Sequence, residues 1–139
     1  KLYLGNLSSL RDWGYAKDYV ECMWLILQHD KPEDFVIATG VQHSVREFCE
    51  YAFREAGIEL EFKGEGMDEV GIDKATGKVI VKVNKKFFRP AEVDVLLGNP
   101  AKAESVLGWK REIPFSDLVA RMVKNDLALV EHELKCQNI

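Results

Sequence analysis

Hydrophobic and polar positions along the chain follow two periods, which predicts a mixed α/β unit with short strands. Alternation, or a short apolar run, predicts strands at 1–4, 59–63 and 79–83, the last one near a sheet edge, and alternation returns at 92–97. The run 35–39 is apolar throughout and closed by Gly40, which is typical of a strand buried on both faces of a parallel sheet. Between these segments, 64–78 is rich in glycine and charge and predicts an exposed loop.

Helical spacing predicts four helices. In the first, Asp18 is the expected N-cap, and a buried stripe is formed by Val20, Met23, Trp24 and Leu27. Ser44 and Glu47 have the spacing of a capping box and predict a second helix that ends near Gly57. Asn99, Pro100 and Gly108 delimit a third helix, after which Trp109 anchors the chain. A fourth begins near Pro114, with an apolar face made of Leu118, Val119, Met122, Val123, Leu129 and Val130.

Composition narrows the class of protein. The chain has 139 residues, 47% of them apolar, which suits one globular domain with a core. A net charge of −4 argues against a nucleic-acid partner, and no apolar run is long enough to span a membrane. Three scattered cysteines favour a reducing, cytoplasmic setting over a disulfide framework. Because Lys1 enters a strand directly, we expect the sequence to be a fragment of a longer protein.

The sequence predicts no catalytic, cofactor-binding or metal site of its own. Gly64 and Gly66 begin a G-x-G-x-x-G pattern, but Glu69 stands where the third glycine belongs. No tyrosine is followed four positions later by lysine, and the three histidines lack metal-ligand spacing. What remains is chemistry for binding a ligand.

Two arginines are candidates for that chemistry. The stretch 89–92 is predicted to form a β-turn around Pro90, which brings the Cα atoms of Arg89 and Glu92 within about 7 Å of each other. A guanidinium and a carboxylate on one rim suit the phosphate and the ribose hydroxyls of a nucleotide. Arg11, flanked by Asp12 and aromatic residues, would supply the second cation that a diphosphate requires. For Arg89 the alternative is an ordinary surface ion pair with Glu92. For Arg11 the alternative is that Trp13 belongs to the core and Arg11 only caps the chain or pairs with Asp12 or Asp18.

Three separated motifs resemble the GDP-mannose 4,6-dehydratase family, a branch of the extended short-chain dehydrogenases/reductases. They are Leu-Gly-Asn-Leu with Arg-Asp-Trp-Gly at 4–14, the segment 32–46, and Phe-Arg-Pro-Ala-Glu-Val with Leu-Gly-Trp-Lys between 88 and 110. The resemblance covers only the C-terminal portion of such an enzyme. It implies that 35–57 contributes the last strand and helix of a Rossmann-type core, that the rest of 1–139 is a small mixed α/β substrate-binding domain, and that the N-terminal cofactor-binding part is absent.

The resemblance also implies roles for residues. Arg11 and Arg89 would bind the diphosphate of GDP-mannose, Glu92 the ribose hydroxyls, and Asn6 would be a neighbouring contact. Tyr15 stands where the family pattern leads us to expect histidine. The catalytic residues would precede Lys1, so we expect this portion alone to be inactive.

The implied reaction converts GDP-mannose to GDP-4-keto-6-deoxymannose, on the route to GDP-fucose, with NADP bound mainly by the absent part. The full-length enzyme would be a homo-oligomer, a dimer or a tetramer. Two alternatives stay open. One is another nucleotide-sugar epimerase or dehydratase of the same superfamily, and the other is a truncated, non-catalytic nucleotide-binding or assembly module.

Overall fold

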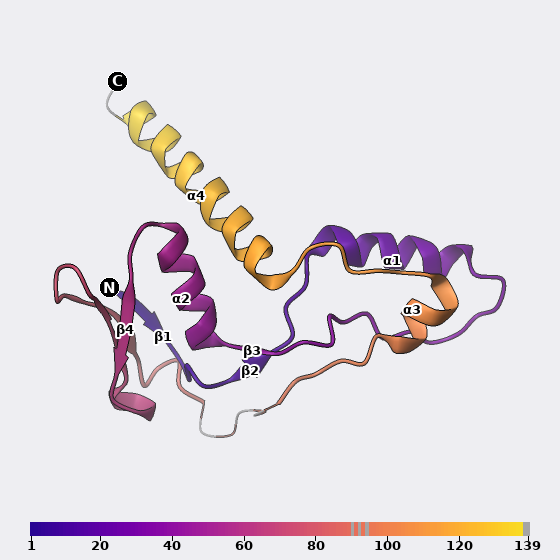
Figure 1. Cartoon of the computed structure of the whole chain (residues 1–139), viewed down its shortest axis with the longest axis horizontal. Helices are drawn as coiled ribbons and strands as arrows, with labels where there is room; N and C mark the ends of the chain where they lie inside the picture. The colour runs from indigo at the N-terminus through magenta and orange to yellow at the C-terminus, as the bar shows by residue number, and fades with distance from the viewer. Residues whose placement is uncertain (90, 92, 94, 138–139) are drawn as a thin grey trace. The chain divides into compact units, whose positions relative to one another are not determined.

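A computed structural model describes residues 1–89, 91, 93 and 95–137, and it shows a mixed α/β chain (Figure 1). The strands are β1 (Leu2–Leu4), β2 (Leu10–Arg11), β3 (His43–Ser44), β4 (Leu60–Lys63), β5 (Val70–Asp73) and β6 (Val79–Val83). The helices are α1 (Ala16–Gln28), α2 (Val45–Glu55), α3 (Ala101–Leu107) and α4 (Phe115–Gln137), with a single 3-10 turn, η1 (Gly66–Asp68). The predicted mixed α/β class is confirmed.

The chain divides into two compact units. The sheet unit comprises Lys1–Ser9, Ser44–Glu92 and Val119–Ile139, and the helix unit comprises Leu10–His43 and Val93–Leu118. The sheet unit holds β1, β4, β5, β6 and α2, whereas the helix unit holds α1 and α3.

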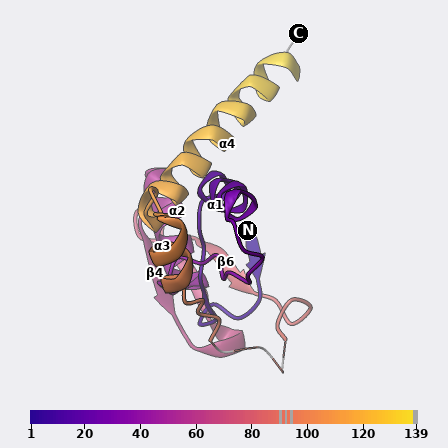
Figure 2. The same ribbon diagram turned by 90° about the vertical axis from the view of Figure 1, so that its right-hand side faces the viewer.

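A four-stranded sheet with the order β1-β6-β5-β4 organises the sheet unit (Figures 1 and 2). β1 runs parallel to β6, with Leu4 opposite Val83, and the other two pairs are antiparallel. β6 lies next to the edge strand β1, with Val81 fully buried. One sequence prediction was wrong here, because the expected loop 64–78 contains β5. β5 is short, so its hydrogen bonds to both neighbours define it more clearly than its own pattern does.

The predicted start of α2 is confirmed. Ser44 is the N-cap, its hydroxyl accepts a hydrogen bond from the Glu47 amide at 3.1 Å, and the Glu47 carboxylate accepts one from the Ser44 amide at 2.6 Å. These two bonds satisfy donors that the first turn leaves unpaired. Cys49 is the buried residue of the helix, and burial raises the pKa of its thiol to about 11. That thiol is therefore neutral near pH 7.

The core of the helix unit lies between α1 and α3. Cys22, Ala103 and Trp109 are its fully buried residues. The indole Nε1 of Trp109 donates to the Asp18 carbonyl at 2.8 Å, which confirms the predicted anchor. α3 ends as expected at Gly108, whose φ of +67° suits a residue without Cβ. At its start, Pro100 is the N-cap, and the side-chain oxygen of Asn99 accepts a hydrogen bond from the amide of Ala101, the first helical residue.

The predicted buried stripe of α1 was wrong. Its four residues are more than half exposed: Val20 60%, Met23 54%, Trp24 59% and Leu27 80%. The helix begins earlier than predicted, with Tyr15 as N-cap, and Asp18 lies inside the first turn. The Asp18 carboxylate accepts hydrogen bonds from the backbone amides of Glu112 and Ile113 instead, so it joins α1 to the segment after α3.

No strand is formed by 35–39, contrary to the prediction. Phe35 and Ile37 pack against the helix-unit core, and the Thr39 amide donates to the Asp12 carboxylate at 2.9 Å. A strand requires a hydrogen-bonded neighbour, and the described residues provide no ladder for this segment. The boundary between units also separates 35–39 from α2, so the assignment of 35–57 to a Rossmann-type core stays a prediction.

The segment 93–97 carries one further correction. Val93, Val95 and Leu97 are 55–57% exposed, and the only pairing that the described residues show is an isolated parallel bridge between Leu10 and Val95. Two residues of the predicted alternation, Glu92 and Asp94, lie outside the described residues.

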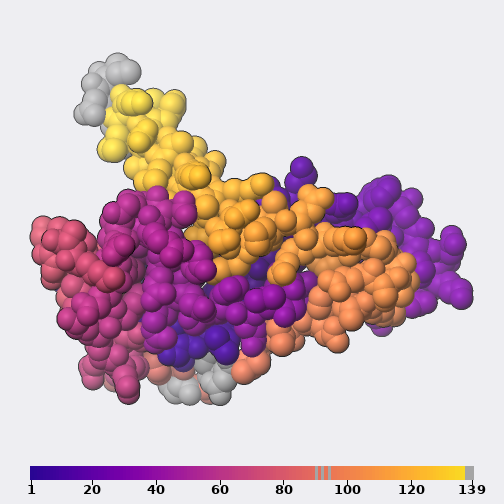
Figure 3. All heavy atoms as spheres, viewed as in Figure 1, coloured from indigo at the N-terminus to yellow at the C-terminus, as the bar shows by residue number. Residues whose placement is uncertain are grey.

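The fourth predicted helix exists and reaches Gln137. Its predicted apolar face is buried only at Leu118 and Val119, whereas Met122, Leu129 and Val130 are about half exposed. Figure 3 shows the later turns of α4, in yellow, open to solvent on the face in view. Within the described part of the chain, every helix is too short or too polar to cross a membrane.

Candidate functional site

The predicted site residues Asn6 and Arg89 follow the carboxyl ends of two neighbouring parallel strands. Asn6 comes two residues after β1, and Arg89 lies on the segment after β6. The two strand ends are tied together, because the Asn84 amide donates to the Leu4 carbonyl at 2.8 Å. Ligands of α/β proteins bind outside the carboxyl ends of parallel strands, so the topology places these two residues where a ligand is expected.

Gly5 permits an unusually close approach between these two segments. A Cβ atom built on Gly5 would lie 2.5 Å from the carbonyl oxygen of Phe87, a distance that real Cβ atoms essentially never show. Only glycine allows the backbone before Asn6 to contact the backbone just before Arg89. Gly5 and the backbone of 87–88 therefore lie side by side.

Asn6 is half-buried and shapes its own loop. Its side-chain oxygen accepts a hydrogen bond from the Ser8 amide at 3.0 Å, which is an Asx turn. The loop is held to α2 by two backbone bonds, from the Val45 amide to the Ser9 carbonyl and from the Arg46 amide to the Leu7 carbonyl. Asn6 thus has a defined position rather than that of a free loop residue.

Arg89 is exposed at the end of a turn that Asn84 organises. The Asn84 carbonyl accepts from the amides of Phe87 and Phe88, and its side-chain oxygen accepts from the Lys86 amide at 2.9 Å. Pro90 and Glu92 lie outside the described residues, so the predicted 89–92 turn and the role of Glu92 stay predictions.

Arg11 lies in the helix unit, where it binds the backbone. Its Nη1 donates to the carbonyls of Leu10 at 2.7 Å and Val93 at 3.1 Å. Val93 follows Glu92 in the sequence, so Arg11 fixes the segment that leaves the predicted turn. Sequence reasoning missed this contact because it joins residues 82 positions apart.

The residues beside Arg11 have partners that the sequence did not predict. Both oxygens of the Asp12 carboxylate accept from the Thr39 amide, and one of them also accepts from the Gly40 amide at 3.0 Å. The Trp13 ring stacks on Phe115 with centroids 5.7 Å apart, and His43 stacks on the same ring at 3.9 Å. The contacts of Asp12 and Trp13 therefore stabilise the part of the helix unit that follows Arg11 in the sequence.

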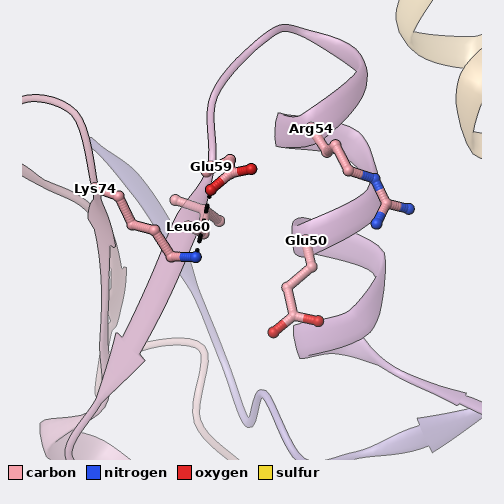
Figure 4. Close-up of a pocket in the computed structure, with 5 residues that line it drawn as sticks. All are labelled: Glu50, Arg54, Glu59, Leu60 and Lys74. Carbon is pink, nitrogen blue, oxygen red and sulfur yellow. Dashed lines mark hydrogen bonds and ion pairs between the residues drawn. The ribbon is translucent and has the colours of Figure 1, made fainter.

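A hollow of about 190 Å³ lies elsewhere in the sheet unit and does not include the predicted residues (Figure 4). It is lined by Glu50, Arg54, Glu59, Leu60 and Lys74. Lys74 follows β5, so the hollow lies at the amino end of β6, opposite to the end where Asn84 leads to Arg89. Lys74 and Glu59 both line the hollow and form an ion pair at 3.4 Å. This pair neutralises part of the charge of the hollow.

Gly64 and Gly66 do not form a phosphate cradle. They lead into η1, a single 3-10 turn of three residues, whereas a dinucleotide site requires the N-terminus of a full helix. Groups of three or more metal-ligating side chains are likewise absent from the described residues. Of the predicted ligand residues that the structure describes, Asn6 and Arg89 follow the carboxyl ends of β1 and β6, whereas Arg11 lies in the helix unit.

Solved structures with a similar fold place the chain in a class. It superposes on RMD from Pseudomonas aeruginosa, complexed with NADPH, with a TM-score of 0.67 at 20% identity, covering 88% of this chain and 34% of that one. A UDP-glucose-4-epimerase from Stenotrophomonas maltophila, with bound NAD, gives a TM-score of 0.67 at 17% identity, covering 95% and 36%. The chain therefore shares the fold of about a third of each of these two structures.

Sequence relatives narrow the class to one family. A family model for GDP-mannose 4,6 dehydratase matches residues 1–122. GDP-mannose 4,6 dehydratase 2 of Caenorhabditis elegans is 61% identical over 128 residues, covering 92% of this chain and 33% of that protein. The Dictyostelium discoideum GDP-mannose 4,6 dehydratase is 53% identical over 131 residues, covering 94% and 37%. This chain belongs to the GDP-mannose 4,6 dehydratase family, and it spans about a third of the length of these relatives.

Proposed function

We propose that this chain is the GDP-sugar-binding portion of a GDP-mannose 4,6-dehydratase. The observation that carries the proposal is the family match over residues 1–122, which includes the motifs that contain Asn6, Arg11 and Arg89. The geometry supports it, because Asn6 and Arg89 follow adjacent strand ends at the edge where ligands of such folds bind. The curated relatives at 53–61% identity carry the dehydratase name, and no comparison favours an epimerase or a non-catalytic module.

Each site residue has a proposed task in that enzyme. The guanidinium of Arg89, exposed beside the β1–β6 edge, binds the diphosphate of GDP-mannose, and Arg11 provides the second cation. Glu92 accepts hydrogen bonds from the ribose hydroxyls. Asn6, whose oxygen is bonded to the Ser8 amide, meets the ligand through its amide nitrogen. A charge-assisted contact contributes about 1.5–3 kcal/mol, so two arginines account for a large share of the affinity.

The reaction removes water from GDP-mannose and yields GDP-4-keto-6-deoxymannose. The described residues fit no dinucleotide, so we assign NADP and the catalytic groups to a part of the enzyme that this chain does not span. When bound there, the nicotinamide supplies the hydride chemistry. The 139 residues alone hold the substrate and are inactive. A homo-oligomeric enzyme and a cytoplasmic location stay predictions.

The decisive experiment uses a hybrid enzyme in which this chain replaces the matching third of the Caenorhabditis elegans relative. We expect the hybrid to convert GDP-mannose to the 4-keto-6-deoxy product, and Arg89→Ala to weaken GDP binding by about one to two decades in calorimetry, as one lost charge-assisted contact requires. Arg54→Ala is the matched control, since Arg54 is also exposed but lies at the opposite end of the sheet. An unchanged GDP affinity in Arg89→Ala would overturn the assignment of the site.

A further inference from the structure

An ion pair between Arg46 and Glu69 connects the loop that contains Asn6 to the strand that leads to Arg89. Arg46, in the first turn of α2, forms a bidentate pair with Glu69: Nε donates to Oε1 at 2.6 Å and Nη2 to Oε2 at 2.9 Å. Glu69 is 3% exposed, whereas the Arg46 side chain keeps about a third of its surface open. Glu69 raises the pKa of the Arg46 guanidinium by accepting these bonds. The Arg46 guanidinium therefore keeps its proton across the physiological pH range.

Arg46 is bonded to the loop that contains Asn6 through both its backbone and its side chain. Its backbone amide donates to the Leu7 carbonyl at 2.9 Å, and its Nη2 donates to the Ser8 hydroxyl at 3.0 Å. Leu7 is 1% exposed, so one side of the loop is anchored in the core. Arg46 therefore fixes the backbone on the carboxyl side of Asn6.

Glu69 reaches the other segment. Its carbonyl accepts a hydrogen bond from the Val83 amide at 3.4 Å, at the carboxyl end of β6. The next residue, Asn84, organises the turn that ends at Arg89. The Glu69 side chain is thus bonded to Arg46, which holds the loop that contains Asn6. The Glu69 backbone is bonded to Val83, which precedes the turn that ends at Arg89.

The local rules of helix formation do not explain an arginine at this place. A cation in the first turn of a helix faces the positive end of the helix dipole, which is unfavourable. The capping box of Ser44 and Glu47 already completes the helix start without Arg46. A buried ion pair is moreover a weak source of stability, because desolvation of the two charges offsets their attraction.

We propose that Arg46 and Glu69 are a positioning pair, which sets the separation of Asn6 and Arg89 and thereby the affinity for the nucleotide without touching the ligand. This inference rests on the proposed function, because it assumes that Asn6 and Arg89 bind GDP-mannose. The pair acts on ground-state binding of the nucleotide. Its loss should therefore raise KM for GDP-mannose and leave kcat unchanged.

The test compares one single and one double substitution in the hybrid enzyme. Arg46→Met leaves the Glu69 carboxylate buried without its partner and should lower the melting temperature. Arg46→Met combined with Glu69→Met removes both charges and should restore the melting temperature, yet it still lacks the bond to Ser8. For this double variant we expect GDP affinity about five-fold weaker by calorimetry, because binding must then order the loop that the bond to Ser8 held, and KM raised to a similar extent.

Arg54→Met, on the same helix but lining the hollow at the other end of the sheet, is the matched control and should leave GDP affinity unchanged. A double variant that is as stable as the parent and binds GDP equally well would overturn the inference. Loss of kcat without a change in KM would also overturn it, since that indicates an interaction made only in the transition state. Arg89→Ala in the same assay separates the two proposals: if it too leaves binding unchanged, the proposed site itself fails.

Discussion

Helices α1 and α2 carry the same kind of amphipathic signal, yet the structure follows the prediction for only one of them. α2 begins at the predicted Ser44, with both bonds of the capping box formed, and it buries Cys49. α1 begins three residues before its predicted start and turns its predicted stripe to solvent, with Leu27 80% exposed. Its buried face is instead the one that carries Cys22.

The difference separates two kinds of information in a sequence. A capping box is completed by residues within one turn of each other, so the local sequence determines it. Burial of a helix face also depends on what lies opposite, and the described helix unit has a core only on the Cys22 side of α1. The chain spans about a third of the length of its curated relatives. The periodic stripe of α1 alone therefore does not tell which segment, if any, packs against that face.

The largest expected effect tests the two faces of α1 against each other. Trp109→Ala should lower the free energy of unfolding by about 3–5 kcal/mol, because Trp109 is 1% exposed and packs beside Cys22. Trp24→Ala, at 59% exposure on the outer face, should change it by less than about 0.5 kcal/mol. Denaturant unfolding of both variants measures the contrast, and equal losses would show that both faces are covered.

A smaller effect is expected at the start of α2. Ser44→Ala removes the hydroxyl that accepts from the Glu47 amide and should cost about 1 kcal/mol. Ser44→Asp keeps an acceptor at the N-cap and should retain most of the stability. If the two variants unfold at the same denaturant concentration, the capping box does not determine where α2 begins.

The smallest effect is expected from Leu27→Lys on the outer face of α1. Leu27 is already 80% exposed, and lysine is a good helix former, so the free energy of unfolding of the chain should change by less than about 0.5 kcal/mol. The same denaturation assay applies. A loss of several kcal/mol in the isolated chain would mean that a second copy or another segment covers the stripe, and the contrast with α2 would disappear.

Much of the fold could be predicted because local signals determine it. The alternation of Leu60 and Phe62, the capping box at Ser44 and the terminal Gly108 each act within a few residues. β5 was missed because a four-residue strand is defined by the two neighbours that pair with it. The reverse error was made at 35–39. This segment was predicted as a strand from its apolar pattern, but it has no strand beside it among the described residues.

The candidate site divides in the same way. The motifs containing Asn6, Arg11 and Arg89 could be recognised along the sequence, but their surroundings could not. Arg11 binds Val93, 82 positions away, and Arg46 binds Glu69, 23 positions away. Glu69 lies in a stretch that the sequence presents only as a charged loop, so no local pattern indicates that its carboxylate is buried.

The contact of Gly5 with Phe87 has an entropic consequence. A ligand that joins two independent loops must order both, and that loss of conformational freedom weakens binding. Here the backbone before Asn6 already contacts the backbone before Arg89, so in the proposed site less backbone freedom remains to be removed when a nucleotide binds. If the proposed site is right, a glycine without any chemical group of its own contributes to affinity by limiting the freedom that binding removes.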